Sequence, residues 1–349
     1  MRNYNKLLTI LIVILFIWCI SLSINRSNQN KQTKNEEIIN QYDVSGFSTD
    51  FTKIVEENEN SIVTVNADNE ISSGFVYKQD GDSVYIVCTY HGVANSNNIH
   101  VIFGTTYTSP AYLIGHDIYT DIAILRIDSP YLIESLKLAD TSLLNKGEFV
   151  ISIGTPLSLD YAASVELGMI SNNINMIENT ISVEDERYTY YLNVVELSSN
   201  LLKGYSGSPV LNMNGEVIGM NTMSLSNDFN FAVTSNEIKI VADKLINQEE
   251  VIRNDLGIKV TFLSEMDNYE KANLGIDLET INGMYVNRVK ENSLAFNSGV
   301  RNGDVITKIN DTEISSINDY LSVIYSDAES FRFTYRRNSE TLEAEAIND

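Results

Sequence analysis

Three short segments of this 349-residue chain carry residue types that could together form a nucleophilic site. His91 follows the strand-like run VCTY, Asp121 begins the run DIAILRI, and Ser206 stands in the glycine-flanked turn GYSGSP. A serine hydroxyl is a weak nucleophile at neutral pH, so it needs an adjacent base, and the base needs an acceptor for its second ring nitrogen. We therefore expect Ser206 to be the nucleophile, His91 the general base and Asp121 the residue that orients the histidine.

The turn around Ser206 could also stabilise the negative charge that such an attack creates. Gly204 and Gly207 allow the backbone to curl so that amide N–H groups near Ser206 point at one spot, and Pro209 fixes the exit from the turn. Removing one such donor typically raises a reaction barrier by about 2.7–4 kcal/mol. The turn is therefore the expected oxyanion-binding element of an acyl-transfer site.

The chain order of the three residues selects among known architectures. The order His, Asp, Ser suits a two-barrel chymotrypsin-like protein, whereas α/β-hydrolases use Ser, Asp, His and need G-x-S-x-G, which fails here at Ser208. Each residue alone has an ordinary alternative: a turn serine, a surface or core histidine, or an aspartate that caps a strand turn. Their joint order and context favour the site, and we expect His100 and His116 to be structural.

The segments around these residues are typical of short strands. Between residues 61 and 236, β-rich runs such as SIVTVNA, SVYIVCT, EFVISIG and EVIGMNT alternate with turn residues. Strands that recur about every 8–12 residues with such turns favour an all-β barrel or sandwich, and this stretch is long enough for two small barrels. An apolar period at 235–247 predicts one helix, capped by Ser235 or Asn236, that closes the β region.

The same stretch resembles the HtrA/Deg family of trypsin-like serine proteases. The resemblance rests on seven collinear segments: SSGFVY, TYHGVA, LIGHDIYTDIAILRI, LNKGEFVISIGTPLSL, ELGMIS, GYSGSPVLNMNGEVIGMNT and FNFAVTSN. It implies a mostly β, chymotrypsin-like double six-stranded β-barrel over 51–248 and serine endopeptidase activity. It also implies that the backbone N–H groups of Gly204 and Ser206 form the oxyanion hole. The residues that it implies for the primary specificity pocket are Leu201, Asn221, Thr222 and Met223, a set that would suit medium aliphatic side chains.

Four residues depart from the family's pattern. The family usually has asparagine before the serine and glycine after the following glycine, where this chain has Tyr205 and Ser208. Ser198 stands where the family commonly has aspartate, and Tyr90 replaces the usual asparagine before the histidine. The departures leave the expected triad complete but bear on the geometry of the loop around Ser206.

Residues 249–349 are expected to form a second, small α/β domain. The stretch SLAFNSGVRNGDVITKIN resembles the PDZ domain of HtrA proteins, and the helix-like INDYLSVIYS and strand-like SFRFTYRR follow it. PDZ domains bind peptide C-termini by strand addition, with backbone amides of one loop holding the carboxylate. By resemblance, Leu256, Gly257 and Ile258 carry that loop. The alternative is a domain with only a packing role.

The start of the chain has the pattern of a membrane anchor. Leu7 to Ile24 are 18 residues without a charge, and such a helix would span roughly 27 Å of a hydrocarbon core about 30 Å thick. A cleaved signal peptide is the alternative, with Ser21 and Ser23 as its small-x-small site. We expect the protease and PDZ domains on the extracytoplasmic side of the cell membrane. The expected order is a cytoplasmic tail at 1–6, a single transmembrane helix at 7–24 and a flexible stalk at 25–50.

Composition argues against other classes of function. The formal net charge of −23 would repel nucleic acid phosphates, so we expect no nucleic acid partner. Cys19 and Cys88 lie in an apolar N-terminal run and a strand-like run and are not expected to pair. No Cys/His cluster has the spacing of metal ligands, so we expect neither a metal nor a cofactor.

Two functions therefore remain open from the sequence. The first is a membrane-anchored endopeptidase that cleaves misfolded or specific exported proteins, with the PDZ domain binding C-terminal peptides of substrates or regulators. The second is a PDZ-containing binding or chaperone-like scaffold with weak or gated protease activity. Because the resembling family commonly forms trimers through N-terminal segments, a homotrimer in which Phe47 and Phe51 pack is a further expectation.

Overall fold

The fold is taken from a computed structural model, which describes residues 47–68, 70–183, 186–199, 201–222, 230–280, 282–338 and 340–347. The predicted tail at 1–6 and transmembrane segment at 7–24 lie outside the described residues. None of the described helices is both long and apolar enough to cross a bilayer. Helix α2 (Phe47–Asn58) begins inside the predicted stalk at 25–50, so the last four residues of that stalk are helical.

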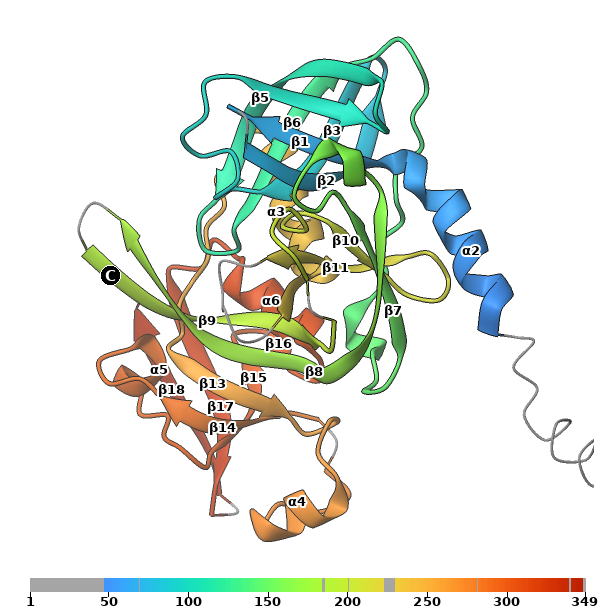
Figure 1. Cartoon of the computed structure of the whole chain (residues 1–349). Coiled ribbons are helices and arrows are strands. Elements are labelled where there is room, and N and C mark those ends of the chain that lie inside the picture. The colour runs from blue at the N-terminus through green and yellow to red at the C-terminus, as the bar shows by residue number, and fades with distance from the viewer. Residues whose placement is uncertain are drawn as a thin grey trace, which may run out of the picture. The chain divides into compact units, whose positions relative to one another are not determined.

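The chain divides between Thr52 and Lys53 into two units, and the second, 53–349, holds all the described strands. In this second unit, six antiparallel strands close a first barrel in the order β1-β2-β3-β6-β5-β4 (Figure 1). A 3-10 turn, η1 (Glu59–Ser61), precedes it. The strands are β1 (Ile62–Ala67), β2 (Glu70–Asp80), β3 (Ser83–Thr89), β4 (Ile99–Phe103), β5 (Tyr107–Asp117) and β6 (Ile122–Asp128).

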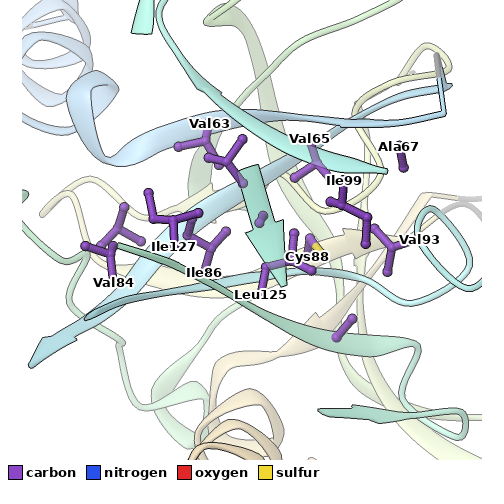
Figure 2. Close-up of a cluster of buried hydrophobic side chains, with 14 residues drawn as sticks. Val63, Val65, Ala67, Val84, Ile86, Cys88, Val93, Ile99, Leu125 and Ile127 are labelled. Atoms are coloured by element: carbon purple, nitrogen blue, oxygen red, sulfur yellow. The ribbon is translucent and has the colours of Figure 1, made fainter. Parts of the chain in front are cut away.

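Alternation of side chains along the strands explains the interior of this barrel. Residues two apart share a face of a strand, so Val63 and Val65 of β1 point inward, as do Val84 and Ile86 of β3 (Figure 2). Cys88 continues the β3 row as a buried free thiol. The packed β-branched interior gives the two loops that follow β3 and precede β6 a rigid support.

A second closed barrel follows, in the order β10-β11-β12-β9-β8-β7. Two 3-10 turns, η2 (Thr141–Leu143) and η3 (Leu159–Tyr161), lie in the loops around its first strand. The strands are β7 (Phe149–Gly154), β8 (Ser164–Val183), β9 (Glu186–Leu197), β10 (Pro209–Leu211), β11 (Val217–Thr222) and β12 (Asn230–Thr234). The mostly β fold that the strand pattern predicts is confirmed.

The predicted closing helix is α3 (Ser235–Ile246), and its apolar face is buried. Its predicted cap is wrong, because Thr234 is the N-cap and accepts from the backbone N–H of Glu237. Both expected caps have other partners: Ser235 Oγ donates to the carbonyl of Ala139, and Asn236 Oδ1 accepts from the N–H of Thr141. These bonds tie the helix to the loop that enters the second barrel.

The C-terminal domain is a small α/β unit built on a six-stranded sheet. The order is β13-β14-β15-β17-β18, with β16 paired to β15, so β13 is an edge strand (Figure 1). Its strands are β13 (Ile258–Phe262), β14 (Met284–Val289), β15 (Val305–Ile309), β16 (Thr312–Glu313), β17 (Ser330–Arg337) and β18 (Glu340–Ile347). Its helices are α4 (Asn268–Asn273), α5 (Leu294–Asn297) and α6 (Ile317–Ile324).

Candidate active site

The first barrel brings His91 and Asp121 together. His91 follows the end of β3 and Asp121 directly precedes β6, and these strands pair so that Thr89 lies opposite Ile122. His91 Nδ1 lies 2.6 Å from Asp121 Oδ2, and the backbone N–H of His91 donates to Asp121 Oδ1 at 2.8 Å. One carboxylate therefore fixes both the ring and the backbone of the histidine.

Asp121 is itself held from two directions. Its φ is +59°, in the left-handed region, and its carbonyl accepts from the backbone N–H of Tyr90 at 2.8 Å. Thr222 Oγ1, at the end of β11 in the second barrel, donates to Asp121 Oδ2 at 2.7 Å. The expectation that Thr222 lines the specificity pocket did not include this bond, which joins the two barrels behind the histidine.

The surroundings of His91 alter its basicity. Burial lowers the pKa of the imidazole, but the hydrogen bond and charge of Asp121, with a smaller charge effect from Glu70, outweigh it and leave the pKa raised. A raised pKa means a stronger base. The side chain of His91 remains 43% exposed, so a substrate can reach it.

The second barrel supplies the turn that carries Ser206, which is 6% exposed. Gly204 and Gly207 have φ values of +105° and +88°. A Cβ on Gly204 would lie 2.3 Å from the carbonyl oxygen of Thr155, and one on Gly207 would lie 2.0 Å from that of Ser73. Glycine is therefore required at both positions by conformation and by space.

The Ser206 hydroxyl and the His91 ring are not hydrogen-bonded to each other in the described part of the chain. Catalytic hydrogen bonds are often long in proteins without substrate and tighten when substrate binds. The side chains expected to act together thus come from two barrels. The hydrogen bond between His91 and Asp121 is formed, and the serine turn lies beside this pair.

The departures from the family pattern have partners in this fold. Ser208 Oγ accepts from Asn221 Nδ2 at 2.9 Å, and Ser198 Oγ accepts from the N–H of Met169 at 2.9 Å. Tyr205 is 4% exposed, and burial raises the pKa of its hydroxyl. The Tyr90 ring stacks on His116, with the ring centres 3.9 Å apart.

The expected pocket residues lie in different settings. Leu201 is buried, and Met223 lies outside the described residues. Asn221 is fully buried, and its amide donates to the hydroxyls of Ser152 and Ser208. Asn221 therefore stabilises the serine turn through its bond to Ser208. The composition of the pocket stays a prediction.

The expected carboxylate-binding loop lies at the start of β13. Gly257 has a φ of +69°, and Leu256 and Ile258 are each 1% exposed. The N–H of Gly257 donates to Asp255 Oδ1 at 2.9 Å. At least one amide of this loop is therefore already occupied by a carboxylate from the chain itself.

Among the described residues, no group of three or more His, Cys, Asp or Glu side chains is arranged to hold a metal ion. Ser73 is a residue that sequence analysis missed: its hydroxyl donates to the carbonyl of Gly204 at 2.7 Å. Two adjacent serines begin the SSGFVY segment, and the sequence gives no means of telling Ser73 from Ser72.

Comparison with family models identifies two domains. A model described as a trypsin-like peptidase domain matches residues 72–220, and one described as a PDZ domain matches residues 254–347. Both expected site regions, around Ser206 and around Gly257, lie inside these matches.

Several curated proteins are similar over most of the chain. The serine protease Do-like HtrB of Bacillus subtilis (strain 168) is 32% identical over 261 residues, which are 73% of this chain and 56% of that protein. The serine protease Do-like HtrA of Lactobacillus helveticus is 29% identical over 281 residues, 78% of this chain and 66% of that protein. The chain thus spans between about half and two thirds of the length of these relatives.

Solved structures share the fold at low sequence identity. The HtrA-type protease AlgW with tripeptide has a TM-score of 0.57 and 22% identity, and covers 85% of this chain and 96% of its own. The serine endoprotease from Yersinia pestis has a TM-score of 0.52 and 21% identity over the same shares of the two chains.

Proposed function

We propose that the chain is a serine endopeptidase of the HtrA family that cleaves misfolded or specific exported polypeptides, because it has a trypsin-like peptidase domain followed by a PDZ domain and is similar to serine proteases Do-like HtrA and HtrB. The observation that carries the proposal is the His91–Asp121 pair, 2.6 Å apart, presented by one barrel beside the Ser206 turn of the other. The chain order of the three residues supports the same assignment.

In the proposed reaction, Ser206 Oγ attacks the scissile carbonyl while His91 takes the hydroxyl proton. The carbonyl oxygen gains a negative charge and accepts hydrogen bonds from the backbone N–H groups of Gly204 and Ser206. Collapse of this intermediate breaks the C–N bond, and His91 gives its proton to the leaving amine. Water then repeats the sequence on the acyl-enzyme, and Asp121 keeps the imidazole oriented throughout.

Casein degradation and fluorophosphonate labelling by the purified full chain test this proposal. We expect both in the natural chain and neither in Ser206→Ala. If the natural chain shows neither activity, and Ser206→Ala changes no phenotype, the peptidase assignment fails. Mass-spectrometric profiling of cleavage sites in cells, natural chain against Ser206→Ala, would then identify substrates.

The scaffold with a weak or gated protease site is the second candidate. It is favoured by the missing hydrogen bond between the Ser206 hydroxyl and His91, and by Tyr205 and Ser208 in the surrounding turn. Binding and protection of unfolded protein that persists unchanged in Ser206→Ala, together with absent labelling of the natural chain, would support it over the first.

For the C-terminal domain we propose binding of peptide C-termini next to β13. In the described sheet β13 is an edge strand that pairs only with β14, and strand addition uses such an edge. The AlgW structures, which contain a tripeptide or a decapeptide, support a peptide-binding role by analogy. Free C-terminal peptides should bind and their amidated forms should not, and equal binding of both would contradict the proposal.

Membrane attachment by residues 7–24 and assembly as a homotrimer are proposed on the sequence pattern and the family resemblance. The first is tested by extraction of membranes, where carbonate should leave the chain bound and detergent should release it. The second is tested by analytical ultracentrifugation of the chain with and without residues 1–50. A monomer in both cases would contradict the trimer.

A further inference from the structure

Ser73 lies in β2 of the first barrel, at its contact with the serine turn, and is fully buried. Its Oγ donates to the carbonyl of Gly204 at 2.7 Å and accepts from the backbone N–H of Thr155 at 2.9 Å. Its own backbone N–H donates to the carbonyl of Ser206 at 2.8 Å. A single residue of one barrel therefore holds two carbonyls of the serine turn that belongs to the other.

The other two carbonyls of the turn are also held. The carbonyl of Lys203 accepts from the N–H of Leu157 at 2.9 Å, and that of Tyr205 accepts from the N–H of Ser208 at 2.8 Å. Every peptide plane from 203 to 206 thus has its oxygen engaged.

The two backbone N–H groups that would bind the oxyanion differ from these carbonyls in their hydrogen bonding. In the described part of the chain, the N–H groups of Gly204 and Ser206 have no hydrogen-bond acceptor. The N–H and C=O of one trans peptide point in opposite directions. The bonds accepted by the carbonyls of Lys203 and Tyr205 therefore fix the directions of the Gly204 and Ser206 N–H groups, which belong to the same two peptides.

The bond from Ser73 differs from the other three that hold the turn. Those three are donated by backbone amides, whereas the carbonyl of Gly204 is held by a side-chain hydroxyl. Without that hydroxyl, both the Gly204 carbonyl and the Thr155 N–H lose a buried partner. The peptide between Gly204 and Tyr205 is then held only through its N–H, which donates to the carbonyl of Leu202 at 3.2 Å. That peptide lies between the two proposed oxyanion donors.

We propose that Ser73 is a positioning residue for the oxyanion hole, whose hydroxyl holds the Gly204–Tyr205 peptide so that the N–H groups of Gly204 and Ser206 converge on the substrate carbonyl oxygen. The proposal rests on the proposed peptidase function. Because the oxyanion exists only after attack, the effect of Ser73 belongs to the transition state rather than to substrate binding.

Ser73→Ala in the full chain tests the proposal, and Ser72→Ala is its matched control. Ser72 is the preceding residue and is also buried, but its hydroxyl has no hydrogen-bond partner among the described residues. In Ser73→Ala we expect kcat for a peptide substrate to fall about 10- to 100-fold, less than the 10²–10³ typical of deleting an oxyanion donor outright. KM should change less than about twofold. Ser72→Ala should retain the natural kcat.

A peptide boronate, which forms a tetrahedral adduct with the serine, separates positioning from general damage. Its affinity should fall with kcat in Ser73→Ala, while the affinity for the cleaved product peptide should not. Ser73→Thr and Ser73→Val repeat the comparison at nearly equal volume, with and without the hydroxyl, in case the alanine variant folds poorly.

Equal kcat and boronate affinity in Ser73→Ala and Ser72→Ala, or in the Thr and Val variants, would overturn the role of Ser73 and leave the peptidase proposal intact. A rise in KM with kcat unchanged would overturn it as well. A natural chain that neither labels with fluorophosphonate nor cleaves peptide would overturn both.

Discussion

Glu70, outside the proposed triad, adds to the charge that acts on His91. Its side chain is 73% exposed, and its carboxylate lies 3.7 Å from Lys203 Nζ. Its charge also raises the pKa of the His91 imidazole, by less than the effects of burial and of Asp121. His91 must be neutral to accept the serine proton, so a raised pKa moves the acid limb of the pH–rate profile upward. The negative charge of Glu70 thus narrows the active range at low pH.

Glu70→Gln should therefore move the acid limb of kcat/KM to lower pH and leave the plateau rate unchanged. Removing the carboxylate makes the imidazolium less stable, so the pKa of His91 falls and more of it is neutral at acidic pH. Initial rates with a peptide substrate across pH 5–9 measure the shift. Glu313→Gln, an equal charge change on β16 of the C-terminal domain, should not move the limb. A limb that stays in place or moves upward in Glu70→Gln would contradict this reasoning.

Asp255, like Glu70, acts on a proposed site through its negative charge, here on the site for the peptide carboxylate. Its Oδ1 accepts from the Gly257 N–H, one of the amides that the site would use. We predict that Asp255→Asn binds free C-terminal peptides several-fold more tightly, because it removes a negative charge that repels the ligand carboxylate. Asp277→Asn is the matched control, since Asp277 Oδ1 accepts from the Glu279 N–H in the same i to i+2 pattern elsewhere in the domain. Isothermal titration that gives weaker or equal binding in Asp255→Asn would exclude the repulsion.

At the scale of elements, the serine turn depends on close backbone contact between the barrels. Gly207→Ala should abolish fluorophosphonate labelling, because its Cβ would lie 2.0 Å from the carbonyl oxygen of Ser73 and the turn would have to move. Gly81→Ala has a similar positive φ of +58° but open space around it, so it should cost only about 1–2 kcal/mol of stability and keep full labelling. Labelling and thermal unfolding are measured together, and full labelling of Gly207→Ala would show that the turn tolerates displacement.

The sequence predicted elements better than it predicted side-chain partners. Alternating apolar runs locate strands such as β3 and β6 because each residue in them has one face to bury. The cap of α3 was missed because Thr234, Ser235 and Asn236 are all residue types that cap helices, and only the contacts of Ser235 and Asn236 with Ala139 and Thr141 exclude these two. The partner of Thr222 was missed because it lies on a distant segment, at Asp121. Helix α4 was not predicted either, since it is short and has few apolar residues to give a period.

The same limit applies to the candidate site. His91, Asp121 and Ser206 could be predicted because their order and flanking segments are local features of the sequence. Ser73 could not be predicted, since nothing in SSGFVY distinguishes the serine that donates to Gly204 from its neighbour Ser72, whose hydroxyl has no partner in the described chain. Only the contact between β2 and the serine turn separates the two.

At the scale of the whole described unit, a buried ion pair joins the peptidase domain to the PDZ domain. Glu237 of α3 is fully buried, and Arg253, in the segment between α3 and β13, has a side chain only 4% exposed. Tyr325, just after α6 of the PDZ domain, donates its hydroxyl to Glu237 Oε1 at 2.7 Å, and Arg253 donates to the carbonyl of Tyr191 in β9 at 2.5 Å. Burial raises the pKa of Glu237 more than Arg253 and Tyr325 lower it.

Arg253→Met should therefore destabilise the chain by about 3–5 kcal/mol at pH 7, because it leaves the Glu237 carboxylate buried without a countercharge. The double variant Glu237→Gln, Arg253→Met removes both charges and should recover most of that loss. The folded-state pKa of Glu237 lies above its unfolded value of about 4.3. The loss of stability in Arg253→Met should therefore be small below the unfolded pKa and grow as pH rises through the folded pKa, where the buried carboxyl group ionises. Thermal unfolding at pH 4.5 and pH 7 should thus show a smaller deficit at the lower pH. A deficit that is equal at both values, or a double variant as unstable as the single one, would mean that Arg253 acts through its contacts with the rings of Tyr190 and Tyr325 rather than through its ion pair with Glu237.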